Sequence, residues 1–123
     1  MIVALTVGLA GALGSMSRYL IDGAVQDRTS GAFPFGTFAV NATGSLILGV
    51  LTGLLWYHGL AGSLRSIFGI GLCGGLTTWS TVSWETVRLA ETGMPGKAAI
   101  NALGGIGISM AAAALGIAAV AIA

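Results

Sequence analysis

The feature that most constrains this chain is its division into four long apolar segments that occupy most of its length. They run over about residues 2–21, 35–57, 67–89 and 98–123. A helix needs roughly 20 apolar residues to cross a bilayer. Four crossings leave only short loops in a chain of 123 residues, so a soluble catalytic domain has no room. The sequence therefore predicts an all-α membrane protein with four transmembrane helices in a single domain, residues 1–123.

Charged residues make up 7% of the chain, against roughly 25% in soluble proteins. The few Lys and Arg form no basic stripe, so we expect no nucleic-acid partner. Cys73, the single cysteine, excludes an internal disulfide and is expected to pack in an apolar run. The chain has no His/Cys cluster with ligand spacing, no phosphate-binding loop and no nucleophile beside a base. An enzyme is therefore not expected.

The loops alternate between the two sides of the bilayer. Residues 22–34 and 90–97 share one side, and residues 58–66 lie on the other side with both termini. We expect Glu85, Arg88 and Glu91 to return the third segment to water. Counting the segment ends, the first side carries four basic residues and the second only Arg65; the four are Arg18, Arg28, Arg88 and Lys97. The positive-inside rule then puts the termini outside the cytoplasm.

Small residues recur on the predicted helices and favour close packing between them. The first segment carries Gly8, Gly11 and Gly14 at a spacing of three. The second segment has the pair Gly49 and Gly53 four residues apart. We expect neighbouring helices to approach closely along these faces.

The third segment contains a polar interruption over residues 74–83. Two glycines that weaken a helix are followed by five hydroxyl side chains in seven residues. Lipid offers an unpaired backbone group no partner, so such a break is stable only inside protein or beside a polar cavity. Past the break, residues spaced i, i+3, i+4 and i+7 share a face if the segment is helical; they are Thr77, Ser80, Thr81 and Trp84. The interruption indicates a path or a binding site.

Two further polar residues within the apolar segments each have two interpretations. Asn41 either joins two helices by hydrogen bonds or presents its amide donor to a passing anion. Arg18 either extends to the interface and pairs with Asp22, one turn away, or attracts anions into a water-filled vestibule.

Three separated motifs resemble those of the Fluc (CrcB) fluoride channels of microbes. They are GALGSMSRY over residues 11–19, PFGTFAVNATG over residues 34–44 and GLCGGLTTWSTVSWE over residues 71–85. The third motif is highly specific to this family. The resemblance implies a passive channel through which cytoplasmic fluoride escapes across a prokaryotic plasma (inner) membrane. It also implies two antiparallel subunits with two pores along their interface.

The same resemblance implies roles for individual residues. Backbone carbonyls of Gly74 and Thr77 would hold a central structural sodium ion together with the partner subunit. Asn41 corresponds to a pore-lining residue and Arg18 to a vestibule residue. Hydroxyl groups expected near the fluoride path are those of Ser80, Thr81 and Ser109.

One departure from the family pattern concerns the positions where the family has two phenylalanines, which are Trp79 and Val82 here. Tryptophan keeps an aromatic edge and valine does not. An antiparallel homodimer of dual topology would pair Trp79 with Val82 in both pores. The alternative is a heterodimer, in which this chain keeps one orientation and a related chain takes the other.

Two other functions compete with a fluoride channel. A small multidrug transporter also has four spans, but it needs a carboxylate deep in the first span, and residues 2–17 contain none. A non-conducting membrane assembly subunit would use the glycine faces for packing alone. That function leaves the polar interruption of the third segment unexplained.

Overall fold

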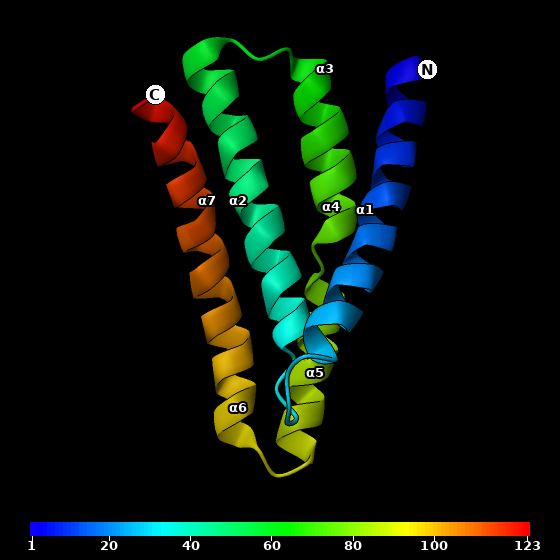
Figure 1. Cartoon of the computed structure of the whole chain (residues 1–123), viewed down its shortest axis with the longest axis vertical. Helices are drawn as coiled ribbons and strands as arrows, with labels where there is room; N and C mark the ends of the chain where they lie inside the picture. The colour runs from blue at the N-terminus through cyan, green and yellow to red at the C-terminus, as the bar shows by residue number, and fades with distance from the viewer.

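The computed structural model describes residues 1–123, which fold into helices without strands (Figure 1). The first two crossings are single helices, α1 (Ile2–Gln26) and α2 (Phe35–His58). The third crossing consists of α3 (Gly62–Arg65), η1 (Ser66–Cys73), α4 (Gly74–Leu76) and, after a break, α5 (Trp79–Glu91). The fourth is continuous through α6 (Pro95–Ala99), η2 (Ile100–Gly104) and α7 (Gly105–Ala121). The η segments have the wider winding of a π-helix, with hydrogen bonds from residue i to i+5.

The four crossings alternate in direction, as predicted. Figure 1 shows both termini and the α2–α3 link at one end, and the loop 27–34 with the turn 92–94 at the other, here called the loop end. Helix α1 continues to Gln26, so the loop is shorter than the sequence predicts. Pro95 begins α6, because its fixed φ suits the first turn of a helix, and Gly93 makes the preceding turn at φ 79°.

Three helices are long and apolar enough to cross a membrane: Ile2–Gln26, Phe35–His58 and Pro95–Ala121. The third crossing is not among them because residues 77 and 78 interrupt it. Length and composition therefore support the predicted multi-pass membrane protein.

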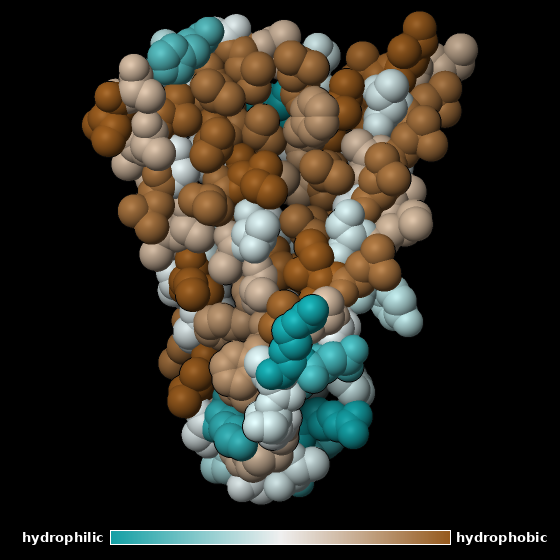
Figure 2. Space-filling model, in the orientation of Figure 1, coloured by the Kyte–Doolittle hydropathy of each residue, from teal (hydrophilic) through white to brown (hydrophobic).

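The surface has the character of a lipid-facing protein. Helix α1 carries large exposed apolar side chains three or four residues apart, namely Leu5, Leu9, Leu13, Met16 and Leu20. Apolar side chains cover most of the visible face, and hydrophilic ones gather towards the loop end (Figure 2). Such a surface is stable in a bilayer and would aggregate in water.

Glycines allow the helices to approach closely, as predicted. A Cβ on Gly14 would overlap the Leu72 carbonyl, and one on Gly49 would overlap the backbone of Ala113. The prediction is wrong for Gly8, around which nothing lies within 4 Å. Cys73 is buried, in agreement with a packing role.

The third crossing changes its neighbours at the break. Before the break, η1 and α4 pack on α1 and α2, whereas after it α5 packs on α6 and η2. Helix α2 packs along α7. The break therefore joins two halves of the bundle that are held by different helices.

Candidate functional site

The break consists of two extended residues between α4 and α5. Thr77 has φ −83° and ψ 156°, and Thr78 has φ −150° and ψ 125°. The helix resumes only at Trp79. Ser80, Thr81 and Trp84 lie in α5 and share a helix face, as predicted. The prediction is wrong for Thr77, which lies outside the helix.

The side-chain amide of Asn41, on α2, hydrogen-bonds to the backbone of the break. Its Oδ1 accepts a 2.7 Å hydrogen bond from the Thr78 backbone N–H, and its Nδ2 donates a 3.1 Å bond to the Thr78 carbonyl. Both polar groups of an extended residue are thereby satisfied where lipid would leave them unpaired. The interpretation of Asn41 as a residue that joins two helices is confirmed.

The Asn41 bonds also change the state of the carbonyls before the break. In an unbroken α-helix the Thr78 N–H would bond to the Gly74 carbonyl four residues earlier. Here that N–H bonds to Asn41 instead, and Gly74 is exposed. The Thr77 carbonyl accepts a long, 3.5 Å hydrogen bond from Arg18 Nη1. The break therefore presents carbonyl oxygens at Gly74 and Thr77.

Arg18 lies at the depth of the break. Its hydrogen bond goes to Thr77 and not to Asp22, so the predicted pairing of these two side chains is wrong. Asp22 lies instead against Gly36, where an added Cβ would overlap it. Because Arg18 lies within the bundle, three basic residues remain near the membrane face at the loop end, and only Arg65 lies near the opposite face.

Thr78 caps the helix that follows the break. Its Oγ1 accepts a 3.2 Å bond from the Thr81 backbone N–H and donates a 2.9 Å bond to Thr81 Oγ1. Ser80 Oγ lies 3.3 Å from Thr78 Oγ1. Sequence reasoning did not single out Thr78, although a threonine directly before a resumed helix is a signal for an N-cap.

Replacing Thr78 with valine should lower stability by about 0.5–2 kcal/mol, the usual contribution of an N-cap hydroxyl. Valine keeps the shape but leaves the first turn of α5 without its acceptor. We expect a lower thermal unfolding midpoint in detergent for Thr78→Val and a near wild-type midpoint for Thr78→Ser. Equal midpoints for the two variants would show that the cap contributes nothing.

A cavity of about 380 Å³ lies beside the break. It is lined from α2, the third crossing and α7, and no carboxylate reaches it. Most of the residues singled out from the sequence line it together: Asn41, Gly74, Thr77, Trp79, Val82 and Ser109. Ser80, Thr81 and Arg18 are not part of its lining.

Trp79 and Val82 differ sharply in exposure. The Trp79 side chain is 65% exposed on the surface of the chain, whereas Val82 is 6% exposed. Trp79 therefore has most of its ring free for lipid or a partner, and Val82 belongs to the packed interior beside the cavity.

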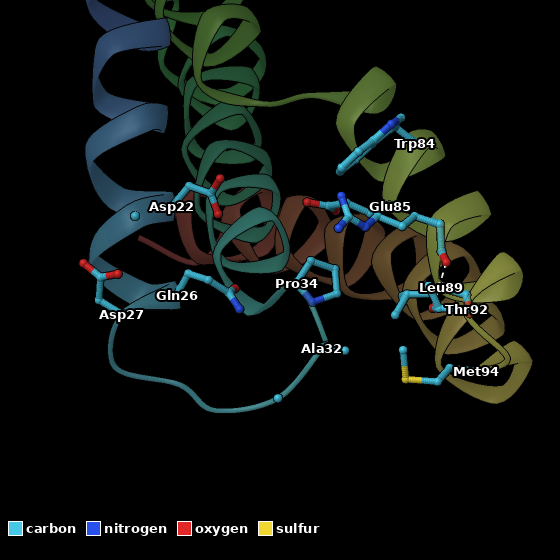
Figure 3. Close-up of a pocket in the computed structure, with 13 residues that line it drawn as sticks. Asp22, Gln26, Asp27, Ala32, Pro34, Trp84, Glu85, Leu89, Thr92 and Met94 are labelled. Atoms are coloured by element: carbon cyan, nitrogen blue, oxygen red, sulfur yellow. Dashed lines mark hydrogen bonds between the residues drawn. The ribbon is translucent and has the colours of Figure 1, made fainter.

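A larger cavity of about 710 Å³ lies at the loop end. Asp22 from α1 and Glu85 from α5 lie on opposite sides of it (Figure 3). Asp27 adds a third carboxylate, and Arg88 is the one basic residue of the lining. An excess of negative charge disfavours an anion, so the smaller, carboxylate-free cavity is the candidate site.

Glu85 points inward, contrary to the expectation that it returns the chain to water. Its Oε1 accepts a 2.7 Å hydrogen bond from the buried Thr37 hydroxyl. Its Oε2 is buried without a partner. Glu85 therefore links α5 to α2 below the break.

A protein-family model matches most of the chain, including the break. The family model described as "CrcB-like protein, Camphor Resistance (CrcB)" matches residues 5–117. All of the residues around the break and the smaller cavity fall within the matched range.

Curated relatives match over most of the chain. "Fluoride-specific ion channel FluC 1" of Leifsonia xyli is 42% identical over 116 residues, 94% of this chain and 85% of the relative. The protein of the same name from Streptomyces avermitilis is 46% identical, covering 89% of each chain. "Fluoride-specific ion channel FluC 2" of Haloarcula marismortui is 44% identical, covering 85% of this chain and 82% of the relative.

Proposed function

The chain belongs to the CrcB-like family, and on that basis we propose that it is a passive fluoride channel that lets cytoplasmic fluoride leave a prokaryotic cell. The family is one of ion channels and not of enzymes. The observation that carries the proposal is the break in the third crossing, which hydrogen-bonds to the Asn41 side chain beside a carboxylate-free cavity. The similar proteins named fluoride-specific channels favour this function over a multidrug transporter or an assembly subunit.

The cavity offers hydrogen-bond donors to an anion that has lost its water. The Asn41 amide has two N–H groups, of which one bonds to Thr78, so the second is available. Ser109 adds a hydroxyl from α7, and Trp79 adds an indole N–H and a positive ring edge. Donors fixed in a site of low dielectric stabilise a small anion more strongly than they would in water.

We further propose that two subunits pack antiparallel and that each path is completed across their interface. The exposure of Trp79 and of Gly74 beside the cavity supports this arrangement. In such a pair, Trp79 of one subunit would lie near Val82 of the other. Ser80, also exposed, and Thr81 would then contribute hydroxyls near the fluoride path, with Arg18 at its vestibule.

The partner is either a second copy or a related chain of opposite orientation. Fluoride flux by this chain purified alone would identify a second copy as sufficient. Flux only after co-expression with another family member from the same genome would identify that chain as the partner.

The carbonyls at Gly74 and Thr77 fit a sodium ion, because sodium prefers oxygen ligands and the Gly74 carbonyl has lost its helical donor. The Arg18 hydrogen bond leaves the Thr77 carbonyl a second lone pair. Two antiparallel subunits would supply both carbonyls twice. When bound, the ion would supply positive charge at mid-membrane, which lowers the free energy of an anion there.

Removing sodium should therefore weaken the assembly. With N-methylglucamine as the only cation, we expect a lower thermal midpoint of the assembled protein and a smaller dimer fraction on size-exclusion chromatography. Restoring sodium should reverse both changes. A dimer fraction and midpoint unaffected by the exchange would exclude a structural sodium ion.

The function itself is tested in sealed liposomes loaded with fluoride. A passive channel releases fluoride once a potassium ionophore balances the charge. A multidrug transporter would instead take up a cationic dye in exchange for protons, and an assembly subunit would do neither.

A further inference from the structure

Asn101 is a buried polar residue in the fourth crossing to which the proposed path assigns no role. It lies in η2 and is 1% exposed. Its Nδ2 donates a 3.3 Å hydrogen bond to the Val82 carbonyl and a 3.0 Å bond to Thr86 Oγ1. Both acceptors are on α5, one turn apart.

The orientation of the Asn101 amide is fixed by its partners. The Val82 carbonyl can only accept a hydrogen bond, so the amide nitrogen must face α5. The opposite atom, Oδ1, is buried without a partner. A buried acceptor without a donor costs about 1–3 kcal/mol, so an apolar side chain of similar size would serve simple packing better.

The π-winding of η2 places Asn101 on the face that reaches the cavity. Asn101 and Ser109 are eight residues apart, which in an α-helix leaves them about 80° apart around the axis. A π turn absorbs one extra residue, so the pair behaves as if seven residues apart, with an offset of about 20°. Gly105, between them on this face, also lines the cavity. One face of the fourth crossing therefore hydrogen-bonds to α5 through Asn101 and presents the Ser109 hydroxyl to the cavity.

Helix α5 needs such a restraint because of the break. It is joined to α4 only through two extended residues, and its contacts pass to α6 and η2. The Asn101 bonds hold the turn from Val82 to Thr86, which begins at a residue lining the cavity.

We propose that Asn101 is a positioning residue that fixes the rotation of α5 against the fourth crossing, and thereby the place of Val82 beside Ser109 at the cavity and of Trp79 on the exposed face of the chain. This inference rests on the proposed channel function. It assigns to Asn101 an effect on conduction and selectivity beyond any effect on folding.

The test compares Asn101→Leu, Thr86→Val and their double variant with Ser83→Ala, which removes an α5 hydroxyl that bonds only to its own helix at Trp79. The measurements are fluoride and chloride efflux from liposomes per folded protein, together with the unfolding midpoint. We expect Asn101→Leu to lower fluoride efflux about tenfold and to reduce the fluoride-to-chloride ratio, because α5 loses both bonds. Thr86→Val should have a smaller effect in the same direction, and Ser83→Ala none.

The double variant should conduct no worse than Asn101→Leu, because the Thr86 hydroxyl has already lost its partner. If Asn101→Leu does not fold, Thr86→Val carries the test alone, and an unchanged efflux and ratio in it overturn the inference. A lower midpoint with wild-type efflux and ratio also overturns it, since Asn101 would then act on stability alone. Wild-type protein without fluoride efflux, alone or with a related chain, would instead overturn the channel function.

Discussion

Replacing Asn41 with aspartate is expected to reduce fluoride efflux by about a hundredfold or more. The variant can still accept the Thr78 N–H, so α2 keeps half of its connection to the break. It loses the donor to the Thr78 carbonyl and places a negative charge in the lining of the cavity. Two like charges about 4 Å apart repel by roughly 4 kcal/mol at an effective dielectric constant of 20, and each 1.4 kcal/mol is a factor of ten in rate.

The matched control is Thr52→Val on the same helix, whose hydroxyl bonds only to the Leu48 carbonyl one turn earlier. Efflux should be measured with a fluoride electrode and normalised to folded, reconstituted protein. Wild-type efflux from Asn41→Asp would remove Asn41 from the fluoride path. Reduced efflux in both variants would indicate a general sensitivity of α2.

Gly75→Ala is expected to have the largest effect on stability. An added Cβ would overlap the Gly11 carbonyl of α1, and backbone cannot move aside as a flexible side chain can. Overpacking of this kind typically costs about 1–3 kcal/mol. We expect a thermal midpoint at least about 5 °C lower in detergent, and less monodisperse protein.

Gly8→Ala is the matched control, because it adds the same methyl group on α1 where nothing lies within 4 Å. It should keep the wild-type midpoint or raise it slightly, since alanine favours the helix by about 1 kcal/mol over glycine. Equal midpoints for the two variants would contradict the close approach of α1 and α4.

The crossings and the break were predictable because both follow from rules that act along the sequence. Bilayer thickness sets the length of each apolar segment. Paired glycines followed by hydroxyl residues weaken a helix locally, so the break lies where the sequence predicts it. The sequence predicts the end of α1 too early, because Asp22, Gly23 and Gln26 are typical of a loop, although residues 22–26 continue the helix.

The partners across the bundle were not predictable, because they depend on how helices tilt and pack. Asn41 and Thr78 are 37 residues apart, and no local signal pairs them. Arg18 has Asp22 one turn away, yet it reaches Thr77 because α1 packs on α4. Gly8 and Gly14 share a spacing, but only Gly14 meets another helix.

The π-wound segments could not be predicted from the sequence, because their residues fit an α-helical pattern equally well. Their effect is large because one absorbed residue turns the following face by about 100°. Asn101 illustrates the consequence: it reads as an isolated polar residue in an apolar run, whereas its bonds to α5 emerge only from the folded bundle.

The most direct test of the proposed channel function is anion efflux from liposomes containing the purified protein, prepared alone and after co-expression with a related chain from the same genome. A fluoride electrode follows release after a potassium ionophore is added, and chloride-loaded liposomes serve as the comparison. A passive fluoride channel should give rapid fluoride release from at least one preparation, little chloride release, and loss of fluoride release in Asn41→Asp. Fluoride retained by both preparations, or chloride released as fast as fluoride, would exclude a fluoride-selective channel.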